Sequence, residues 1–262
     1  RQGRRIRNID AHDIICKIGE CVVAGGVRRT AMISLSDLDD VEIRDAKKGQ
    51  FWNTDPQRML ANNSAVYNEK PSNEQFMEEW IALMLSRSGE RGIFNRGGLA
   101  TTLPKRRLDI LKEKGIVAED GRIVGLIGTN PCGEIILQSK QFCNLSEVVA
   151  RHEDTLESLK RKIKIATILG TYQASLTKFP YLSKEWQENC EREALLGVSI
   201  TGQWDSHVVR DPKVLRQLKL ETIKVNERYA KRFGINESTC ITCVKPSGNL
   251  SQTVDCSSGV HP

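Results

Sequence analysis

The sequence predicts an α/β protein, because segments with a helical apolar period alternate with short apolar or β-branched runs. Several helical segments also carry start and stop signals, such as a Ser or Asp cap and a terminal Gly. The chain has 262 residues, of which 39% are hydrophobic and 27% charged, so a sizeable core is possible. No apolar run approaches the ~20 residues that span a bilayer, which excludes a membrane protein.

The first third of the chain predicts two helices and one strand. A helix is expected over residues 11–24, after Asp10 as N-cap, with apolar residues at Ile14, Ile15, Ile18 and Val22. Gly25-Gly26 ends this helix, and the alternation over residues 30–35 predicts a strand. Ser72 and Gln75 form a capping box for a helix over about 73–88, which predicts an inner stripe of Phe76, Trp80, Leu83 and Met84.

The last 110 residues predict three helices and two strands. A long helix is expected over about 154–178. One side of it is apolar and consists of Leu156, Leu159, Ile163, Ala166, either Leu169 or Ile168, and Tyr172. Ser183 caps a short helix that ends near Ala194, and residues 195–200 predict a buried strand. Asp211-Pro212 opens a helix that Gly234 ends. Residues 241–245 predict a last strand that leads into a Pro-Ser-Gly turn.

Residues 97–125 are rich in Gly, Lys and Arg, and we expect a surface excursion there. Its Lys-Arg-Arg cluster at 105–107 is expected on a solvated face, with contact to phosphates as the alternative. Lys and Arg exceed Asp and Glu by 39 to 33, an excess of 6 that suits an anionic small ligand but also an ordinary surface. The chain starts without Met, lacks a signal peptide and stops at His261-Pro262, so we expect a piece of a longer protein.

The chain contains eight cysteines, and the absence of a secretory signal predicts reduced thiols in the cytoplasm. No His or Cys spacing is typical of a metal site, so none is expected. Cys240 and Cys243 form a CxxC pair without a second pair, and on a strand their sulfurs would diverge. Packing is the expected role of the other thiols away from the chemical motif, namely Cys16, Cys21, Cys190 and Cys256.

The segment from Asn130 to Glu134, with the sequence NPCGE, is the most informative one for chemistry. If its backbone is extended, Asn130, Cys132 and Glu134 share one face, which brings an amide, a thiol and a carboxylate together. Cys143 follows eleven positions after Cys132. A buried Cys beside an exposed Glu in a turn is the structural alternative.

Four sequence motifs resemble the catalytic subunit of ribonucleotide reductases: NPCGEI at 130–135, FCNL at 142–145, KPSGNLSQ at 245–252 and SSGVHP at 257–262. The stretches GGVRRTAMISL at 25–35 and ANNSAV at 61–66 are similar to that family too. The short spacing of eleven positions between Cys132 and Cys143 resembles the spacing in the adenosylcobalamin-dependent class II enzymes, in particular the monomeric ribonucleoside-triphosphate reductases. The resemblance implies a ten-stranded α/β barrel of two antiparallel half-barrels with a central finger loop, of which residues 1–262 would form a part.

The resemblance also implies a role for each residue of the motif. Cys132 at the finger tip would become a thiyl radical that takes hydrogen from the ribose 3′-carbon, since S–H and activated C–H bonds are similar in strength. Glu134 would act as general base on the 3′-hydroxyl, and Asn130 would hold the carboxylate or the sugar. Cys143 would be one of two thiols that reduce the 2′-position and end as a disulfide, with its partner upstream of this chain.

The family also uses a loop that matches residues 247–251 to bind the substrate's phosphates. Gly248 permits unusual backbone angles, and a helix that begins near Ser251 would add its dipole. The expected phosphate-binding residues are Ser247, Gly248, Asn249, Leu250 and Ser251, with Asn249 standing where Thr is expected. A plain strand-to-helix turn is the alternative, and Arg28 and Arg29 are the next candidates for the phosphates.

The implied function is radical reduction of ribonucleotides to deoxyribonucleotides for DNA replication, with adenosylcobalamin as cofactor. The implied partners are a ribonucleotide substrate, a nucleotide allosteric effector and a thioredoxin-like reductant, without membrane or stable nucleic-acid binding. One alternative is the large subunit of a class I ribonucleoside-diphosphate reductase, which would carry a longer gap between the two cysteines. Another is a basic nucleic-acid-binding module that uses the clusters at 1–7, 104–107 and 160–164, although these lack interleaved aromatic residues.

Overall fold

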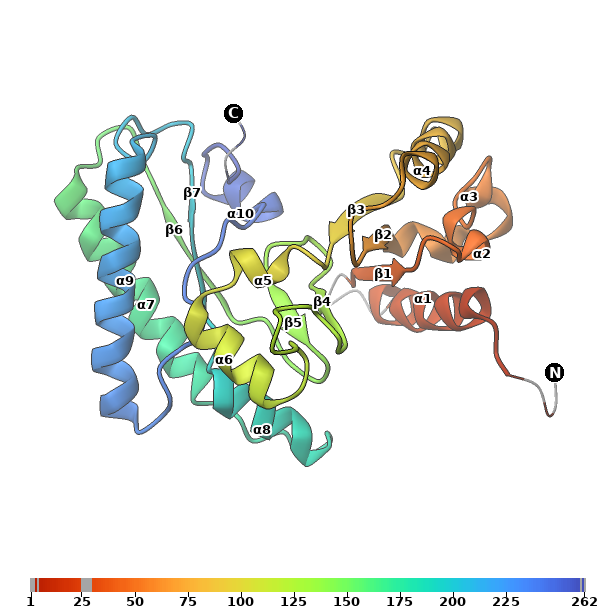
Figure 1. Cartoon of the computed structure of the whole chain (residues 1–262). Coiled ribbons are helices and arrows are strands. Elements are labelled where there is room, and N and C mark those ends of the chain that lie inside the picture. The colour runs from red at the N-terminus through yellow and green to blue at the C-terminus, as the bar shows by residue number, and fades with distance from the viewer. Residues whose placement is uncertain (1–2, 4, 25–29, 260, 262) are drawn as a thin grey trace. The chain divides into compact units, whose positions relative to one another are not determined.

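The computed structural model describes residues 3, 5–24, 30–259 and 261 and confirms a mixed α/β chain (Figure 1). Its residues form two compact units. Unit one contains residues 1–102 and 117–131, and unit two contains residues 103–116 and 132–262. No helix among the described residues is long and apolar enough to cross a membrane. Arg28 and Arg29, the alternative phosphate ligands, lie outside the described residues.

Unit one is built around a three-stranded parallel sheet in the order β1-β2-β3. These strands are β1 (Met32–Ser36), β2 (Ala61–Tyr67) and β3 (Gly92–Asn95), with Met32 opposite Ala61 and Ser64 opposite Gly92. Parallel neighbours need a crossover, and α4 (Asn73–Ser86) provides it between β2 and β3. The remaining elements are α1 (Asn8–Ala24), α2 (Val41–Arg44), α3 (Phe51–Thr54), a 3₁₀ helix (Pro56–Leu60), α5 (Leu99–Thr102) and β4 (Ile127–Thr129).

Unit two pairs β6 (Leu145–Val149) with β7 (Gly197–Thr201) in parallel, and α7 (Leu156–Ala174) lies between them in sequence. Figure 1 shows α7 beside α9 (Pro212–Phe233), and residues of both helices pack against the two strands. The core includes Val148, Leu159, Ile163, Val198, Ile200 and Leu218. The other elements are α6 (Lys105–Glu113), β5 (Ile136–Gln138), α8 (Lys184–Glu193) and α10 (Gly248–Thr253).

Most helix ends lie where the caps predicted them. The Ser72 and Gln75 capping box of α4 is present, and Ser183 is the N-cap of α8. Asp211 accepts a hydrogen bond from the Lys213 N–H at the start of α9, and Gly234 ends that helix with φ of 67°. Asp10 is wrong as a cap, because α1 begins at Asn8 and the Asp10 carboxylate accepts hydrogen bonds from Arg7.

The inner stripe predicted for α4 is wrong, and the apolar residues of α1 do not form a buried face either. Among the described residues, Ile14, Ile15, Ile18 and Val22 of α1 are exposed, as are Phe76, Trp80 and Met84 of α4. The buried sides carry polar groups instead. His12 and Cys16 of α1 are buried, and Glu79 of α4 pairs with Arg91 at 2.9 Å. Leu169 and Tyr172 of α7 are exposed too, whereas Leu159 and Ile163 are buried as predicted.

The segment 97–125 is not the surface excursion that its composition predicts. It contains α5 and α6, whose Leu111 is fully buried. Arg107 from the Lys-Arg-Arg cluster is 1% exposed, and its Nε lies 2.7 Å from the Glu193 carboxylate, which is itself inaccessible. A buried charge needs such a partner, so this arginine stabilises unit two and meets neither solvent nor a phosphate.

The predicted strand at residues 241–245 is reduced to a single parallel bridge between Thr242 and Val198. The Val198 N–H donates to the Ile241 carbonyl at 2.8 Å, and the Cys243 N–H donates to the Val198 carbonyl at 3.1 Å. Residues 241–243 therefore run beside β7 without forming a regular strand. This contact positions the turn that follows at Pro246 and Ser247.

Candidate functional site

The segment that carries Cys132 forms a turn, and not the extended backbone in which Asn130, Cys132 and Glu134 would share one face. Residues 131–135 are turn and bend, and Gly133 has φ of 84°, a region that favours glycine. Alternation therefore does not decide which side chains share a face here. Asn130 is 7% exposed and Cys132 is exposed. The turn thus presents the thiol, which is what a reactive tip requires.

The β6–β7 pair has one core face and one polar face, because successive side chains of a strand point to opposite sides. Val148 and Val198 belong to the core against α7 and α9. The other face carries Leu145 and Glu147 on β6, opposite Gly197 and Ser199 on β7 in the parallel register. Cys143 stands two residues before Leu145. We refer to this second face as the site face.

Gly197 is the point at which three segments of unit two converge on the site face. A Cβ atom at Gly197 would lie 2.6 Å from Leu145 Cδ2, 2.9 Å from Ile135 Cδ1 and 3.1 Å from Cys243 Sγ. Ile135 directly follows Glu134, and Leu145 lies two residues after Cys143. The missing side chain of Gly197 therefore leaves room for the turn, the start of β6 and the 241–243 segment to pack together.

The thiols of Cys132 and Cys143 share one electrostatic environment. Partial desolvation of the thiol and then the Glu134 carboxylate raise the pKa of Cys132, and the Lys245 ammonium partly offsets this. Burial and then Glu134 also raise the pKa of Cys143, with a smaller contribution from Cys132. Glu134 therefore lies near enough to act on both thiols, and both stay protonated over a wider pH range than an ordinary cysteine.

Cys243 is a third thiol at the site, which the sequence prediction missed. Burial, followed by Glu134 and Glu147, raises the pKa of Cys243 to about 12. The other member of the CxxC pair, Cys240, contacts Arg107 Nη1 at 3.8 Å. The two sulfurs thus have different neighbours, as the spacing predicts. The only sequence signal for Cys243 was its place two residues before Lys245 and the KPSGNLSQ motif.

The expected phosphate loop begins with an unusual conformation at Ser247, which has φ of 63° and is buried. Its hydroxyl oxygen has no hydrogen-bond partner among the described residues. The Ser251 hydroxyl, by contrast, donates to the Gly248 carbonyl at 2.8 Å. The helix α10 begins at Gly248 and not near Ser251, while Asn249 and Leu250 are exposed.

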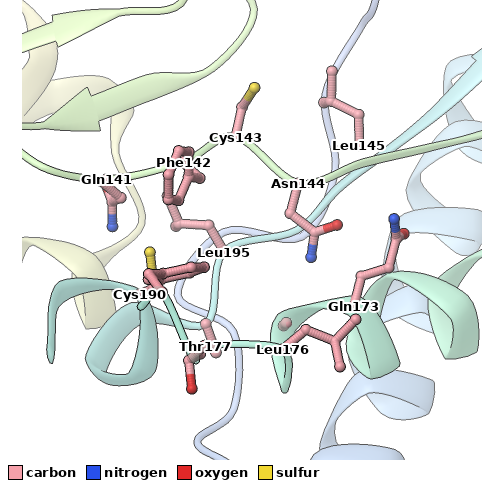
Figure 2. A pocket seen from close by; sticks show the side chains of 13 residues that line it. Gln141, Phe142, Cys143, Asn144, Leu145, Gln173, Leu176, Thr177, Cys190 and Leu195 are labelled. Carbon is pink, nitrogen blue, oxygen red and sulfur yellow. The ribbon is translucent and has the colours of Figure 1, made fainter. Parts of the chain in front are cut away.

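A cavity of about 400 Å³ lies beside Cys143 in unit two (Figure 2). Figure 2 shows the Cys143 side chain directed away from Cys190, another thiol that lines the cavity. Apolar and polar side chains share the wall, including Phe142, Leu195 and Gln173. Pockets for drug-sized ligands take ~300–1,000 Å³, so this cavity has room for part of a nucleotide but not for a whole cobalamin.

The chain resembles known proteins in sequence, although no family model matches it. It is 30% identical over 295 residues to the adenosylcobalamin-dependent ribonucleoside-triphosphate reductase of Lactobacillus delbrueckii subsp. bulgaricus. It is also 30% identical to the enzyme of that name from Lactobacillus leichmannii, and 28% identical to that from Euglena gracilis. These alignments cover 100%, 100% and 95% of this chain, but only 37%, 37% and 32% of the relatives.

A solved structure shows the same relationship in three dimensions. The crystal structure of a B-12 dependent (class II) ribonucleotide reductase superposes with a TM-score of 0.71 and 28% sequence identity. The match covers 99% of this chain and 37% of that chain. The chain thus spans about a third of the length of the proteins it matches.

Proposed function

The chain is a homologue of the adenosylcobalamin-dependent, class II ribonucleotide reductases, and we propose that it forms part of the catalytic centre of such an enzyme. The proposed reaction is the reduction of ribonucleotides, in particular ribonucleoside triphosphates, to 2′-deoxyribonucleotides. The observation that carries the proposal is the grouping of Cys132, Glu134 and Cys143 in unit two, where Glu134 acts on both thiols. The ten-stranded barrel with Cys132 at its finger tip is part of this proposal.

Each residue of the group has a chemical task in the proposed reaction. Cys132 takes a hydrogen atom from the 3′-carbon as a thiyl radical, which requires a neutral thiol beforehand. The raised pKa of Cys132 supports this requirement. Glu134 removes the 3′-hydroxyl proton, and its Oε2 atom is buried without a hydrogen-bond partner among the described residues. Asn130 holds the sugar or the carboxylate through its amide.

Cys143 supplies one of the two thiol groups whose oxidation to a disulfide balances the loss of the 2′-hydroxyl as water. Its partner thiol lies outside this chain in the proposal, and a thioredoxin-like reductant restores the pair. Such thiols require a reducing compartment, which makes a cytoplasmic location part of the proposal. The described cysteines are free, as this chemistry needs.

The phosphates of the substrate are proposed to bind at Ser247, Gly248, Asn249, Leu250 and Ser251. The unpartnered, buried hydroxyl of Ser247 supports this assignment. The bond from the Ser251 hydroxyl to Gly248 means that Ser251 must rearrange before its hydroxyl can donate to a phosphate. Asn249 and Leu250 contribute backbone N–H groups in this proposal.

Adenosylcobalamin is proposed as the cofactor because the relatives are named for it, and when bound it would supply the radical. The cavity beside Cys143 does not fit a whole cobalamin. We therefore assign no residue of this chain to cofactor binding. A nucleotide effector, the remaining proposed partner, has no assigned residue either.

A class I reductase and a nucleic-acid-binding module are the less supported alternatives. The relatives and the solved structure are named as cobalamin-dependent enzymes, which disfavours class I. One residue from each of two basic clusters is paired within unit two: Arg107 with Glu193, and Lys162 with Asp154 at 2.6 Å. Such pairing removes charge that phosphate contacts would need.

The test uses the full-length protein that contains this chain, with ribonucleoside triphosphates, adenosylcobalamin and a dithiol. We expect deoxyribonucleotide formation without a second subunit and no product from Cys132→Ser, because an O–H bond is too strong to replace S–H. Cys143→Ser should still form the radical but release free base from a decomposing sugar. Cys21→Ser, an exposed thiol of α1, is the matched control and should retain activity. Normal turnover by Cys132→Ser would refute the proposal.

A further inference from the structure

Glu147 lies on the site face and has one carboxylate oxygen that nothing in the described chain uses. Its side chain is only 5% exposed, and the Lys245 ammonium donates to Oε2 at 2.7 Å. The second oxygen, Oε1, is buried and has no hydrogen-bond partner among the described residues. A buried, unpaired carboxylate oxygen is costly, so a ligand that donates a hydrogen bond to it would bind favourably.

The fold fixes Glu147 and Lys245 in place from three segments. Glu147 lies opposite Ser199 in the β6–β7 register. The Ser199 hydroxyl in turn accepts a hydrogen bond from the Lys245 backbone N–H at 2.9 Å. The side chain and the backbone of Lys245 are therefore both tied to the site face. This anchoring sets the direction of the Glu147 carboxylate before any ligand arrives.

A second ion pair in unit two shows what a purely structural carboxylate looks like here. Asp154 is also 5% exposed and pairs with Lys162 at 2.6 Å. Both of its oxygens are used, because Oδ1 accepts from the Ser158 hydroxyl and Oδ2 accepts from the Arg151 N–H. Glu147 has the same burial and the same kind of partner, but it retains a free acceptor. Glu147 therefore keeps an acceptor that a ligand can use, whereas Asp154 does not.

The surroundings indicate what that ligand is. Glu134 has a buried and unpartnered oxygen as well, Oε2. Both Glu134 and Glu147 raise the pKa of the half-buried Cys243 thiol, so the two carboxylates lie near a common region of unit two. Carboxylate oxygens accept hydrogen bonds and repel phosphates, so two free acceptors beside a thiol fit the hydroxyl groups of a sugar.

We propose that Glu147 is a further substrate-binding residue, whose Oε1 accepts a hydrogen bond from a sugar hydroxyl of the ribonucleotide. Lys245 is the positioning residue that holds the Glu147 carboxylate through Oε2. This inference rests on the proposed function, since it takes the bound sugar at Cys132 and Glu134 as given. It adds an acceptor on β6 to the one on the turn, so that two hydroxyls of the ribose are held from two segments.

The experiment measures equilibrium binding to the full-length protein for a ribonucleoside triphosphate and its 2′-deoxy and 3′-deoxy analogues. Glu147→Gln keeps a carbonyl oxygen for Lys245 but places an amide N–H₂ where an acceptor is needed. We expect this variant to bind the ribonucleotide at least tenfold more weakly, because a hydrogen bond to a charged group is lost. The analogue that lacks the relevant hydroxyl should bind the variant and the wild type equally.

Two further variants separate ligand binding from folding. Lys245→Met leaves the carboxylate but removes its holder, so ribonucleotide binding should weaken while the dependence on the hydroxyl persists. Lys162→Met breaks the matched Asp154 pair, and it should lower Tm without changing the preference for a hydroxyl. Glu147→Gln should lose the preference for the ribonucleotide over the deoxy analogue that lacks the relevant hydroxyl. A merely structural role of Glu147 would not produce this loss.

The inference is overturned if Glu147→Gln discriminates between the ribonucleotide and both analogues as the wild type does. It is also overturned if Glu147→Gln and Lys162→Met behave alike in all binding assays. Failure of the proposed function would look different, because the wild-type protein itself would then bind or reduce no ribonucleotide.

Discussion

Gly197→Ala is the substitution that tests most directly whether packing on β7 controls the chemistry at the turn. The new Cβ would lie 2.6, 2.9 and 3.1 Å from atoms of Leu145, Ile135 and Cys243, all shorter than ordinary van der Waals contact. Overpacking of this kind costs ~1–3 kcal/mol. The Leu145 and Ile135 atoms are ends of flexible side chains that can rotate, so we expect the lower half of that range.

The same shift should affect catalysis more than stability. Ile135 directly follows Glu134, so a displaced Ile135 side chain moves the segment that carries the proposed base. Misplacement of a reacting group by about 1 Å can cost on the order of 100-fold in rate. A displacement of a few tenths of an ångström should therefore lower kcat/KM by about tenfold, while Tm falls by only a few degrees.

The assay compares kcat/KM and Tm of the full-length wild type, Gly197→Ala and the control Gly170→Ala. Gly170 lies in α7, where a Cβ would come no closer than 3.2 Å to Leu196. Alanine also gains up to ~1 kcal/mol of helix propensity over glycine, so this control should be nearly neutral. If Gly197→Ala retains kcat/KM within twofold, or if the control loses as much, the reasoning about Gly197 is refuted.

Two other outcomes follow from the charges of unit two. Arg107→Met should destabilise the protein by ~3–5 kcal/mol in chemical denaturation, because it leaves the Glu193 carboxylate buried without its cationic partner. Adding Glu193→Leu in the same chain should recover part of the loss, and a double variant no more stable than the single one would contradict this reasoning. Glu134→Gln should lower the pKa of Cys132 and speed its alkylation at a fixed pH, whereas Lys245→Met should raise that pKa and slow the reaction, since only the thiolate reacts. Mass spectrometry of iodoacetamide-labelled protein across pH measures the alkylation rate of Cys132 in both variants. If both substitutions changed this rate in the same direction, Glu134 and Lys245 would not have the opposite effects on the Cys132 pKa that are assigned to them.

The sequence predicted helix ends well because capping is local. Asp211, Pro212 and Gly234 each act within one turn of the helix they delimit, so no knowledge of the rest of the fold is needed. The same holds for the capping box at Ser72 and Gln75. The boundaries of α4 and α9 could therefore be predicted within about two residues from single motifs.

Burial was predicted less well, because a partner far away in sequence decides it. Arg107 belongs to a basic cluster and would be exposed on composition alone, but Glu193 lies 86 positions later and neutralises it within the core. The stripes of Phe76 and Trp80 on α4 show the converse. Helical spacing identifies an apolar face, but it does not identify what covers that face.

The candidate site was predicted as a set of residues but not as a geometry. The motif resemblance predicts Cys132, Glu134 and Cys143 as site residues, and in the structure Glu134 raises the pKa of both thiols. The shared face depended on an extended backbone at Cys132, which is absent because Gly133 adopts a positive φ within a turn. Glu147 was missed because its relevance depends on a free oxygen and on Lys245, which no local pattern reveals.

The parallel pair of β6 and β7 explains how a stable core and a polar site can occupy neighbouring positions. Val148 and Val198 pack against α7 and α9, while Glu147 and Ser199, each one residue away, point to the opposite face. A charged residue on the core face would lack a partner and destabilise the fold, whereas on the site face Lys245 pairs with Glu147. The two-residue period of a strand thus separates residues that hold the protein together from residues that are free to serve a ligand.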